Sequence, residues 1–299
     1  MSEHFLAGEL VIDRERELDI FRDVLDRASG PCVVTVEDDS GFGKSLLLQL
    51  FEQHATDTDP PAVTACTRLE ESAQLMWLVE EISRGLAACG APLERFEELN
   101  LARMTRDHEK FGLSAPAVPN VEVKIINSEL RDSPTTGANI AGWPDSWLDG
   151  HERAAQEACL RALLDDLCEL SRRRTVVLLL DQYERRTPEI EQWLDRALLT
   201  RVLHNVDPFG TLVLVVASTH AAFPKLAKQL GPRSADLLCP IPGLSRWGDD
   251  HIDQWLEQVG IRDSKAWVPA IRSLLDRGTS LQDLRMFAGE LRAAMPGAF

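Results

Sequence analysis

Apolar residues recur along the chain at two spacings, and each spacing predicts a different element. Residues 14–28 place Leu18, Phe21 and Leu25 three or four positions apart with charges between them, which predicts an amphipathic helix. Residues 32–37, CVVTVE, instead form a short apolar run after a Gly-Pro break, which is typical of a strand buried on both faces. A helix and then a buried strand therefore open the chain.

The same alternation continues through most of the sequence. A glycine-rich stretch follows the first strand, and a helix-forming run begins at Lys44. Further apolar runs predict strands at 62–67, 175–181, 211–219 and 235–241, with helical spacing at 72–89, 151–173, 188–203 and 222–231. Strand, glycine loop, helix and strand in this order make a βαβ unit, which requires parallel strands. The predicted fold class is α/β, a parallel sheet with helices on both faces.

Two regions depart from this alternation. Residues 112–150 are rich in Pro, Gly, Asn, Ser and Thr, and only 121–126, VEVKII, has strand character, so we expect an irregular insertion. After residue 248 the spacing is helical only, at 249–260, 264–278 and 280–295. We expect a sheet domain over 1–243 and a small helical domain over 244–299.

Charge narrows the classes of partner. The chain has 32 basic and 48 acidic side chains, a net charge of −16. Its field repels polyphosphates, which predicts no nucleic-acid partner and no anionic-membrane partner. No run approaches the ~18 apolar residues of a spanning helix, and the N-terminus lacks a basic segment before an apolar run, so we expect a soluble cytoplasmic protein. The six scattered cysteines lack a C-x-x-C pair and are expected to be buried thiols, forming neither disulfides nor a zinc site.

The sharpest motif is residues 38–45, DDSGFGKS, between a predicted strand and a predicted helix. Its second half matches the phosphate-loop pattern G-x-x-x-x-G-K-[ST]. The two glycines would let backbone N–H groups surround phosphates, Lys44 would neutralise the β- and γ-oxygens, and the Ser45 hydroxyl would ligate Mg²⁺. The helix N-terminus faces the same anion. The candidate nucleotide-binding residues here are Gly41, Gly43, Lys44, Ser45 and Leu46. The alternative is a glycine turn that happens to precede a helix.

The first position of the pattern holds Asp38 in place of glycine, between Glu37 and Asp39. Three carboxylates beside a polyanion site oppose binding by like-charge repulsion, which Mg²⁺ and solvent partly offset. The hypothesis is that the loop binds nucleotide weakly, or keeps only its turn geometry. Asp38→Gly should then bind ATP more tightly in a titration, and no gain contradicts the hypothesis.

A carboxylate ends the predicted strand 175–181. Asp181 at this point, well downstream of a phosphate loop, is placed to hold the Mg²⁺ shell. Glu184 is a candidate to activate the attacking water, and a solvated strand-end acid is the alternative. Gln182 occupies the position where a second acid usually follows.

Polar residues also end the predicted strand 211–219. Ser218, Thr219 and His220 would meet a ligand at the carboxyl end of the sheet and sense a γ-phosphate. The alternative is that Ser218 or Thr219 caps the following helix. Trp143 and Trp147, within 112–150, are candidate interface anchors.

With these motifs the chain resembles the STAND branch of AAA-like P-loop ATPases, and more narrowly the NACHT and NB-ARC-like modules of bacterial conflict and signalling systems. The segment IDRERE, with Ile12 and Arg14, is similar to the family's adenine-side entry motif. Residues 278–285, GTSLQDLR, are similar to its lid segment, which implies a nucleotide contact for Arg285. The resemblance covers about residues 8–110 and 151–294.

The resemblance implies an ATP-dependent switch that binds ATP or ADP with Mg²⁺ and hydrolyses slowly or not at all. It also implies a protein effector or sensor supplied in trans and nucleotide-linked self-assembly. Two alternatives stand beside it. One is a degenerate scaffold of the same fold that binds no nucleotide and acts by protein–protein interaction. The other is a motor or loader ATPase acting on nucleic acid or protein, which acidity, Asp38 and Gln182 disfavour.

Overall fold

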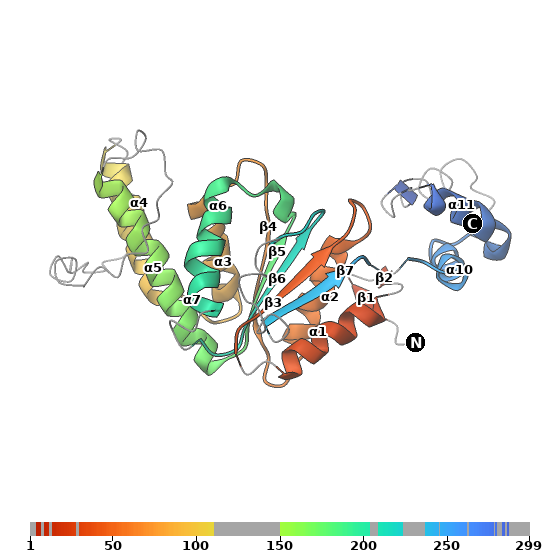
Figure 1. Ribbon diagram of the computed structural model, residues 1–299, viewed down its shortest axis with the longest axis horizontal. Helices are drawn as coiled ribbons and strands as arrows, with labels where there is room; N and C mark the ends of the chain where they lie inside the picture. Colours follow the sequence, from red (N-terminus) through yellow and green to blue (C-terminus); the bar gives the residue numbers. More distant parts are fainter. Residues whose placement is uncertain are drawn as a thin grey trace.

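The computed structural model describes residues 4–6, 9–11, 14–27, 30–110, 150–203, 209–223, 237–244, 246–261, 263–277, 279, 283, 284 and 286. Within them a five-stranded parallel sheet forms the centre of the molecule, in the order β4–β5–β6–β3–β7 (Figure 1). The strands are β3 (Cys32–Glu37), β4 (Val63–Arg68), β5 (Val176–Asp181), β6 (Leu212–Ser218) and β7 (Leu238–Pro242).

Helices cover both faces of this sheet (Figure 1). Val177 and Leu179 of β5 pack in one apolar cluster with α1 (Glu15–Arg27) and α2 (Lys44–Thr56). The opposite face of the sheet packs on α3 (Leu75–Ala88), α5 (Gly150–Arg173) and α6 (Pro188–Trp193). Because side chains alternate along a strand, the unbroken apolar run of β5 supplies both cores at once. The predicted fold class is confirmed.

Several elements differ from the sequence-based expectation. Helix α4 (Glu94–Lys110), packed along α5, and the hairpin β1 (His4–Leu6) and β2 (Glu9–Val11) were not predicted. The single helix expected over 188–203 contains a π-helical turn at Leu194–Leu198, followed by α7 (Leu199–Leu203).

A pair of helices follows the sheet and has its own apolar cluster. α10 (Asp249–Gln258) and α11 (Ser264–Asp276) bury Ile252, Leu256 and Ile271 between them. In Figure 1 the pair lies beyond the β7 side of the sheet, at the opposite end of the molecule from α4 and α5. Of the helix expected at 280–295 only residues 283, 284 and 286 are described, all three helical, and Leu284 is buried in the same cluster. The strand 121–126 with its insertion, and all but the first two residues of 222–231, lie outside the described residues.

All six cysteines are free thiols. Cys159 and Cys168 are buried, and burial raises the pKa of the Cys159 thiol to about 11. The expectation of buried thiols is met only by these two, since Cys32, Cys89 and Cys239 are half-buried. Cys66 is exposed because β4 is an edge strand with one face uncovered at Cys66 and Arg68. None of the described helices combines the length and apolarity that crossing a bilayer requires.

Candidate functional site

The loop between β3 and α2 has the conformation that its glycines predict. Gly41 and Gly43 adopt φ of 84° and 91°, in the left-handed region that strains other L-residues. Gly43 is also the N-cap of α2, so the helix begins at Lys44. The first N–H groups of any α-helix lack intrahelical acceptors, and those of α2 lie at the end of the glycine loop. They are therefore available to an anion bound by the loop.

Lys44 folds back across this loop. Its buried ammonium donates to the backbone carbonyls of Asp38 and Asp39, both at 2.6 Å. Burial lowers the pKa of Lys44, while carboxylates act in the opposite direction, those of Glu184, Asp38, Asp181 and Asp39. The loop thus holds one buried cation within the field of several acids.

Ser45 and Asp181 meet although 136 residues separate them in sequence. The Ser45 hydroxyl donates to Asp181 Oδ2 at 2.6 Å, and Gln182 N donates to Asp181 Oδ1 at 2.9 Å. The contact arises because β5 lies two strands from β3 in the sheet, so its carboxyl end faces the start of α2. The fold therefore unites the two predicted Mg²⁺ ligands.

Glu184 also faces the loop. Gln182 takes a left-handed conformation, with φ of 56°, and turns the chain after β5 into the 3-10 turn Tyr183–Arg185. Half-buried Glu184 then accepts from Thr219 N at 3.2 Å, and it is the charge acting most strongly on Lys44. Glu184 thus lies half-buried at the strand end, with one carboxylate oxygen bound to the backbone of the turn that follows β6.

The polar residues at the end of β6 lie beside Glu184. Thr219 contributes its backbone N–H, while Ser218 Oγ accepts from His220 N at 3.3 Å within a local turn. The helix that Ser218 or Thr219 was expected to cap falls outside the described residues.

Asp38 has partners that the sequence did not predict. Its Oδ1 accepts from Asp39 N at 2.7 Å and from Arg246 Nη2 at 2.8 Å, and its Oδ2 accepts from Leu244 N at 2.7 Å. The carboxylate that was expected to repel phosphate is therefore compensated by a guanidinium and two N–H groups. Arg246 lies in an undistinguished loop after β7, and no spacing in the sequence marked it.

The remaining candidates divide between the loop and the undescribed residues. Buried Arg14 donates to the carbonyl of Phe42 at 2.9 Å and so supports the loop backbone. Leu46 packs its side chain against the core between α2 and the sheet, which leaves its backbone N–H as its contribution to a ligand site. Ile12 and Arg285 lie outside the described residues.

The donor set fits a hydrated magnesium nucleotide. Mg²⁺ prefers oxygen ligands and takes one or two from protein, the rest being water and phosphate oxygens. Ser45 Oγ and Asp181 Oδ2 are such oxygens, and they already lie 2.6 Å apart. Nowhere in the described part of the chain, this site included, are three or more His, Cys, Asp or Glu side chains arranged to hold a metal by themselves.

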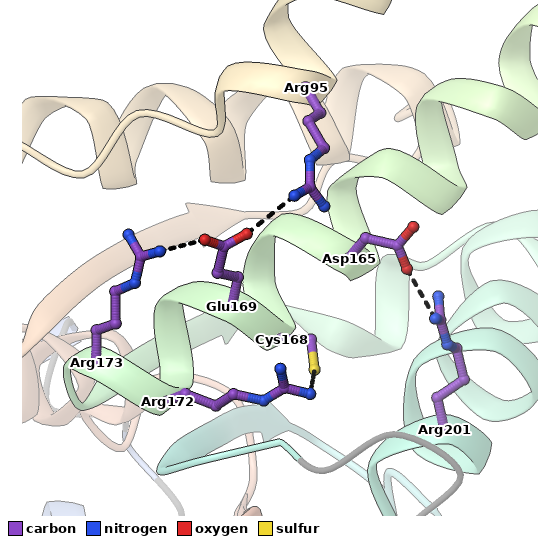
Figure 2. A pocket seen from close by; sticks show the side chains of 7 residues that line it. All are labelled: Arg95, Asp165, Cys168, Glu169, Arg172, Arg173 and Arg201. Carbon is purple, nitrogen blue, oxygen red and sulfur yellow. Dashed lines mark hydrogen bonds and ion pairs between the residues drawn. The ribbon is translucent and has the colours of Figure 1, made fainter.

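A polar cavity of about 500 Å³ is lined by side chains of α4, α5 and α7 (Figure 2). Its walls are Arg95, Asp165, Cys168, Glu169, Arg172, Arg173 and Arg201. Arg95 and Arg173 share Glu169, Arg201 donates to Asp165 at 2.8 Å, and Arg172 donates to Cys168 Sγ at 3.3 Å. The cavity is therefore bordered by a network that fastens α4 and α7 to α5.

Comparison with known proteins places the chain in no family. No protein-family model matches it, and no curated protein matches it. Among solved structures it is similar to ORC2 of Aeropyrum pernix in its ADP form, at 16% identity and a TM-score of 0.46 over 88% of this chain and 56% of that one. It is also similar to Cdc6p of Pyrobaculum aerophilum, at 14% identity and 0.44 over 82% and 48%.

A third similar structure is the replication initiator DnaA bound to AMPPCP and single-stranded DNA, at 11% identity and a TM-score of 0.42 over 96% of this chain and 63% of that one. The chain thus spans less than two thirds of the length of each of these proteins. Such distant likeness adds nothing to the topology already described.

Proposed function

We propose that the chain binds ATP or ADP with Mg²⁺ at residues 38–45 and acts as a regulatory P-loop module. The observation that carries the proposal is the 2.6 Å contact of Ser45 with Asp181, beside the buried ammonium of Lys44. A bare glycine turn before a helix does not require a strand-end carboxylate on the serine hydroxyl. The glycine loop, lysine, hydroxyl and carboxylate together form a set for a magnesium-bound polyphosphate.

Each residue has a distinct role in this proposal. Lys44 exchanges its carbonyl partners for phosphate oxygens, and the N–H groups at the start of α2 donate to the same anion. Ser45 and Asp181 hold Mg²⁺, which neutralises phosphate charge within a site rich in carboxylates. Arg14 keeps the loop in shape through the Phe42 carbonyl.

Turnover is expected to be slow or absent. Glu184 is the candidate base, and its Oε2 accepts from Thr219 N–H at 3.2 Å. This hydrogen bond fixes one carboxylate oxygen and leaves Oε1 to orient a water, while Gln182 stands where a second acid usually follows. Slow hydrolysis suits a switch that reports which nucleotide is bound, with a protein effector or sensor in trans, as in the signalling and defence modules that the sequence resembles.

The first experiment measures nucleotide carried by the purified protein. Natively purified wild type is denatured, and the released nucleotide is quantified by chromatography beside Lys44→Ala and a matched control, Lys265→Ala, at an exposed lysine of α11. We expect close to one equivalent of ADP or ATP from wild type and from the control, and none from Lys44→Ala. Equal amounts from all three proteins contradict the assignment of the loop.

A second candidate function rests on a specific contact. Lys44 is already satisfied by two carbonyls of its own loop, so the turn is held together without an anion. This arrangement favours a nucleotide-free scaffold that acts by protein–protein interaction. Wild type that carries no nucleotide, and that also fails to bind added ATP·Mg²⁺, decides for the scaffold.

A further inference from the structure

The segment that joins the sheet to α10 has its two ends in different cores. Leu244 is 4% exposed and packs with the sheet, α1 and α2. Trp247, three residues later, packs against the cluster of α10 and α11. Any change in how the helix pair meets the sheet must therefore turn about the short stretch between Leu244 and Trp247.

Asp38, in the phosphate loop, accepts hydrogen bonds from this stretch. Its carboxylate accepts from the N–H of Leu244 and from the guanidinium of Arg246 at 2.7 and 2.8 Å. The Asp38 side chain is 4% exposed and that of Arg246 is 52% exposed, so the pair has one buried end. A hydrogen bond between charged groups with a buried end resists opening more than a surface pair does.

Arg246 makes a second contact with the same loop. Its guanidinium carbon lies 3.8 Å from the centroid of the Phe42 ring, the distance of a cation–π contact. Beyond it, Arg272 of α11 donates to the carbonyl of Trp247 at 2.5 Å and to Asp249. A chain of contacts thus leads from the loop through the joining segment to α11.

Lys44 connects this chain to the ligand site. Lys44 Nζ donates to the backbone carbonyl of Asp38, and the side chain of the same Asp38 accepts from Leu244 N in the segment that joins the sheet to α10. A phosphate that draws Lys44 away would remove this contact with the Asp38 carbonyl, while the Asp38 N–H still donates to the Ser218 carbonyl at 3.3 Å.

We propose that Asp38, where the phosphate-loop pattern has glycine, is a positioning residue that clasps Leu244 and Arg246 to the loop and links loop occupancy to α10 and α11. The clasp itself stands on the contacts above, and only its link to occupancy rests on the proposed nucleotide binding. The aspartate at this position thus has a role that glycine could not perform, because glycine has no side chain to bond Leu244 and Arg246.

The test is hydrogen exchange of the full chain followed by mass spectrometry. Asp38→Asn and Arg246→Gln are compared with wild type and with two exposed controls at the C-terminal end of α11, Asp276→Asn and Arg277→Gln. Without nucleotide, exchange at Leu244 and in α10 should rise about tenfold in both clasp variants and stay unchanged in both controls. If Asp38→Asn and Arg246→Gln exchange at Leu244 and in α10 as wild type does, the proposed clasp is wrong, whether or not the protein binds nucleotide.

The second arm adds ATP·Mg²⁺ to the same proteins. In wild type, bound nucleotide should change exchange at Leu244, and Arg246→Gln should change nucleotide affinity by the matching factor, because coupling is reciprocal. Binding without either change overturns the link and leaves the proposed function standing. Absence of binding in wild type removes the proposed function and the link together, while the nucleotide-free comparison still decides the clasp.

Discussion

Lys44 is the residue whose charge depends most on its surroundings. Burial favours the neutral amine and lowers its pKa, and the surrounding carboxylates only partly restore the ammonium. An anion bound at the loop would favour the ammonium, because it brings negative charge against the same nitrogen. Nucleotide and proton should therefore bind to this site with positive linkage.

The affinity for ATP·Mg²⁺ should therefore decline at alkaline pH. The free protein loses the Lys44 proton at a lower pH than an ordinary lysine, whereas the complex retains it. Above the pKa of the free protein, affinity falls by up to about tenfold per pH unit, and below it Lys44 contributes no slope. Titration calorimetry at increasing alkaline pH, up to about pH 10 and so below the pKa of an ordinary lysine, measures this.

Lys44→Arg provides the control, since its guanidinium stays charged over the whole range and any binding it retains should not follow this profile. A flat wild-type profile contradicts the assignment of Lys44 to the phosphate contact.

At the scale of elements, the sheet and its helices approach closely where side chains are small. A Cβ added to Gly85 of α3 would lie 2.9 Å from Cβ and 3.0 Å from Cα of Ala65 on β4. Glycine inside a helix is otherwise unfavourable by about 1 kcal/mol relative to alanine. The packing of α3 on β4 therefore outweighs helix propensity at this position.

Gly85→Ala should destabilise the protein by about 1–3 kcal/mol, because the contact with the backbone of Ala65 forces α3 outward. Gly150→Ala is the matched control, since its Cβ meets no atom within 4 Å and should leave stability unchanged or slightly raised. Urea unfolding followed by circular dichroism gives both values. A stabilised Gly85→Ala variant contradicts the close packing.

At the scale of the whole molecule, charge governs association. With a net charge of −16, two copies repel each other, and so do the protein and a nucleic acid. Salt separates the two cases, because it relieves repulsion between copies but weakens any contact with phosphates. The predicted nucleotide-linked assembly should therefore strengthen with salt.

Sedimentation velocity tests this in ATP·Mg²⁺ at about 0.05 and 0.3 M NaCl, a range over which screening changes markedly. We expect a larger species with nucleotide, more of it at the higher salt, and none in Lys44→Ala. Identical sedimentation with and without nucleotide contradicts nucleotide-linked assembly. A salt-sensitive complex with single-stranded DNA in the same experiment contradicts the prediction of no nucleic-acid partner.

The sequence alone determined the elements with strong local signals. The apolar runs of β3, β5 and β6 predicted buried parallel strands, because a strand covered on both faces needs no polar side. Gly41, Gly43, Lys44 and Ser45 were recognisable because their spacing encodes a turn and a helix start within one short loop. Helix α4 was missed because its polar composition hides a narrow apolar face, and because its main packing partner, α5, is distant in the sequence.

Only the tertiary structure decided which side chains meet. Ser45 reaches Asp181 across 136 positions and Asp38 reaches Arg246 across 208, and no local pattern encodes either pair. Asp38 alone predicted repulsion of phosphate, whereas in the fold the same carboxylate holds the segment leading to α10. The physical reason is that the effect of a charge depends on its neighbours in space, which the sheet order sets and the local sequence does not.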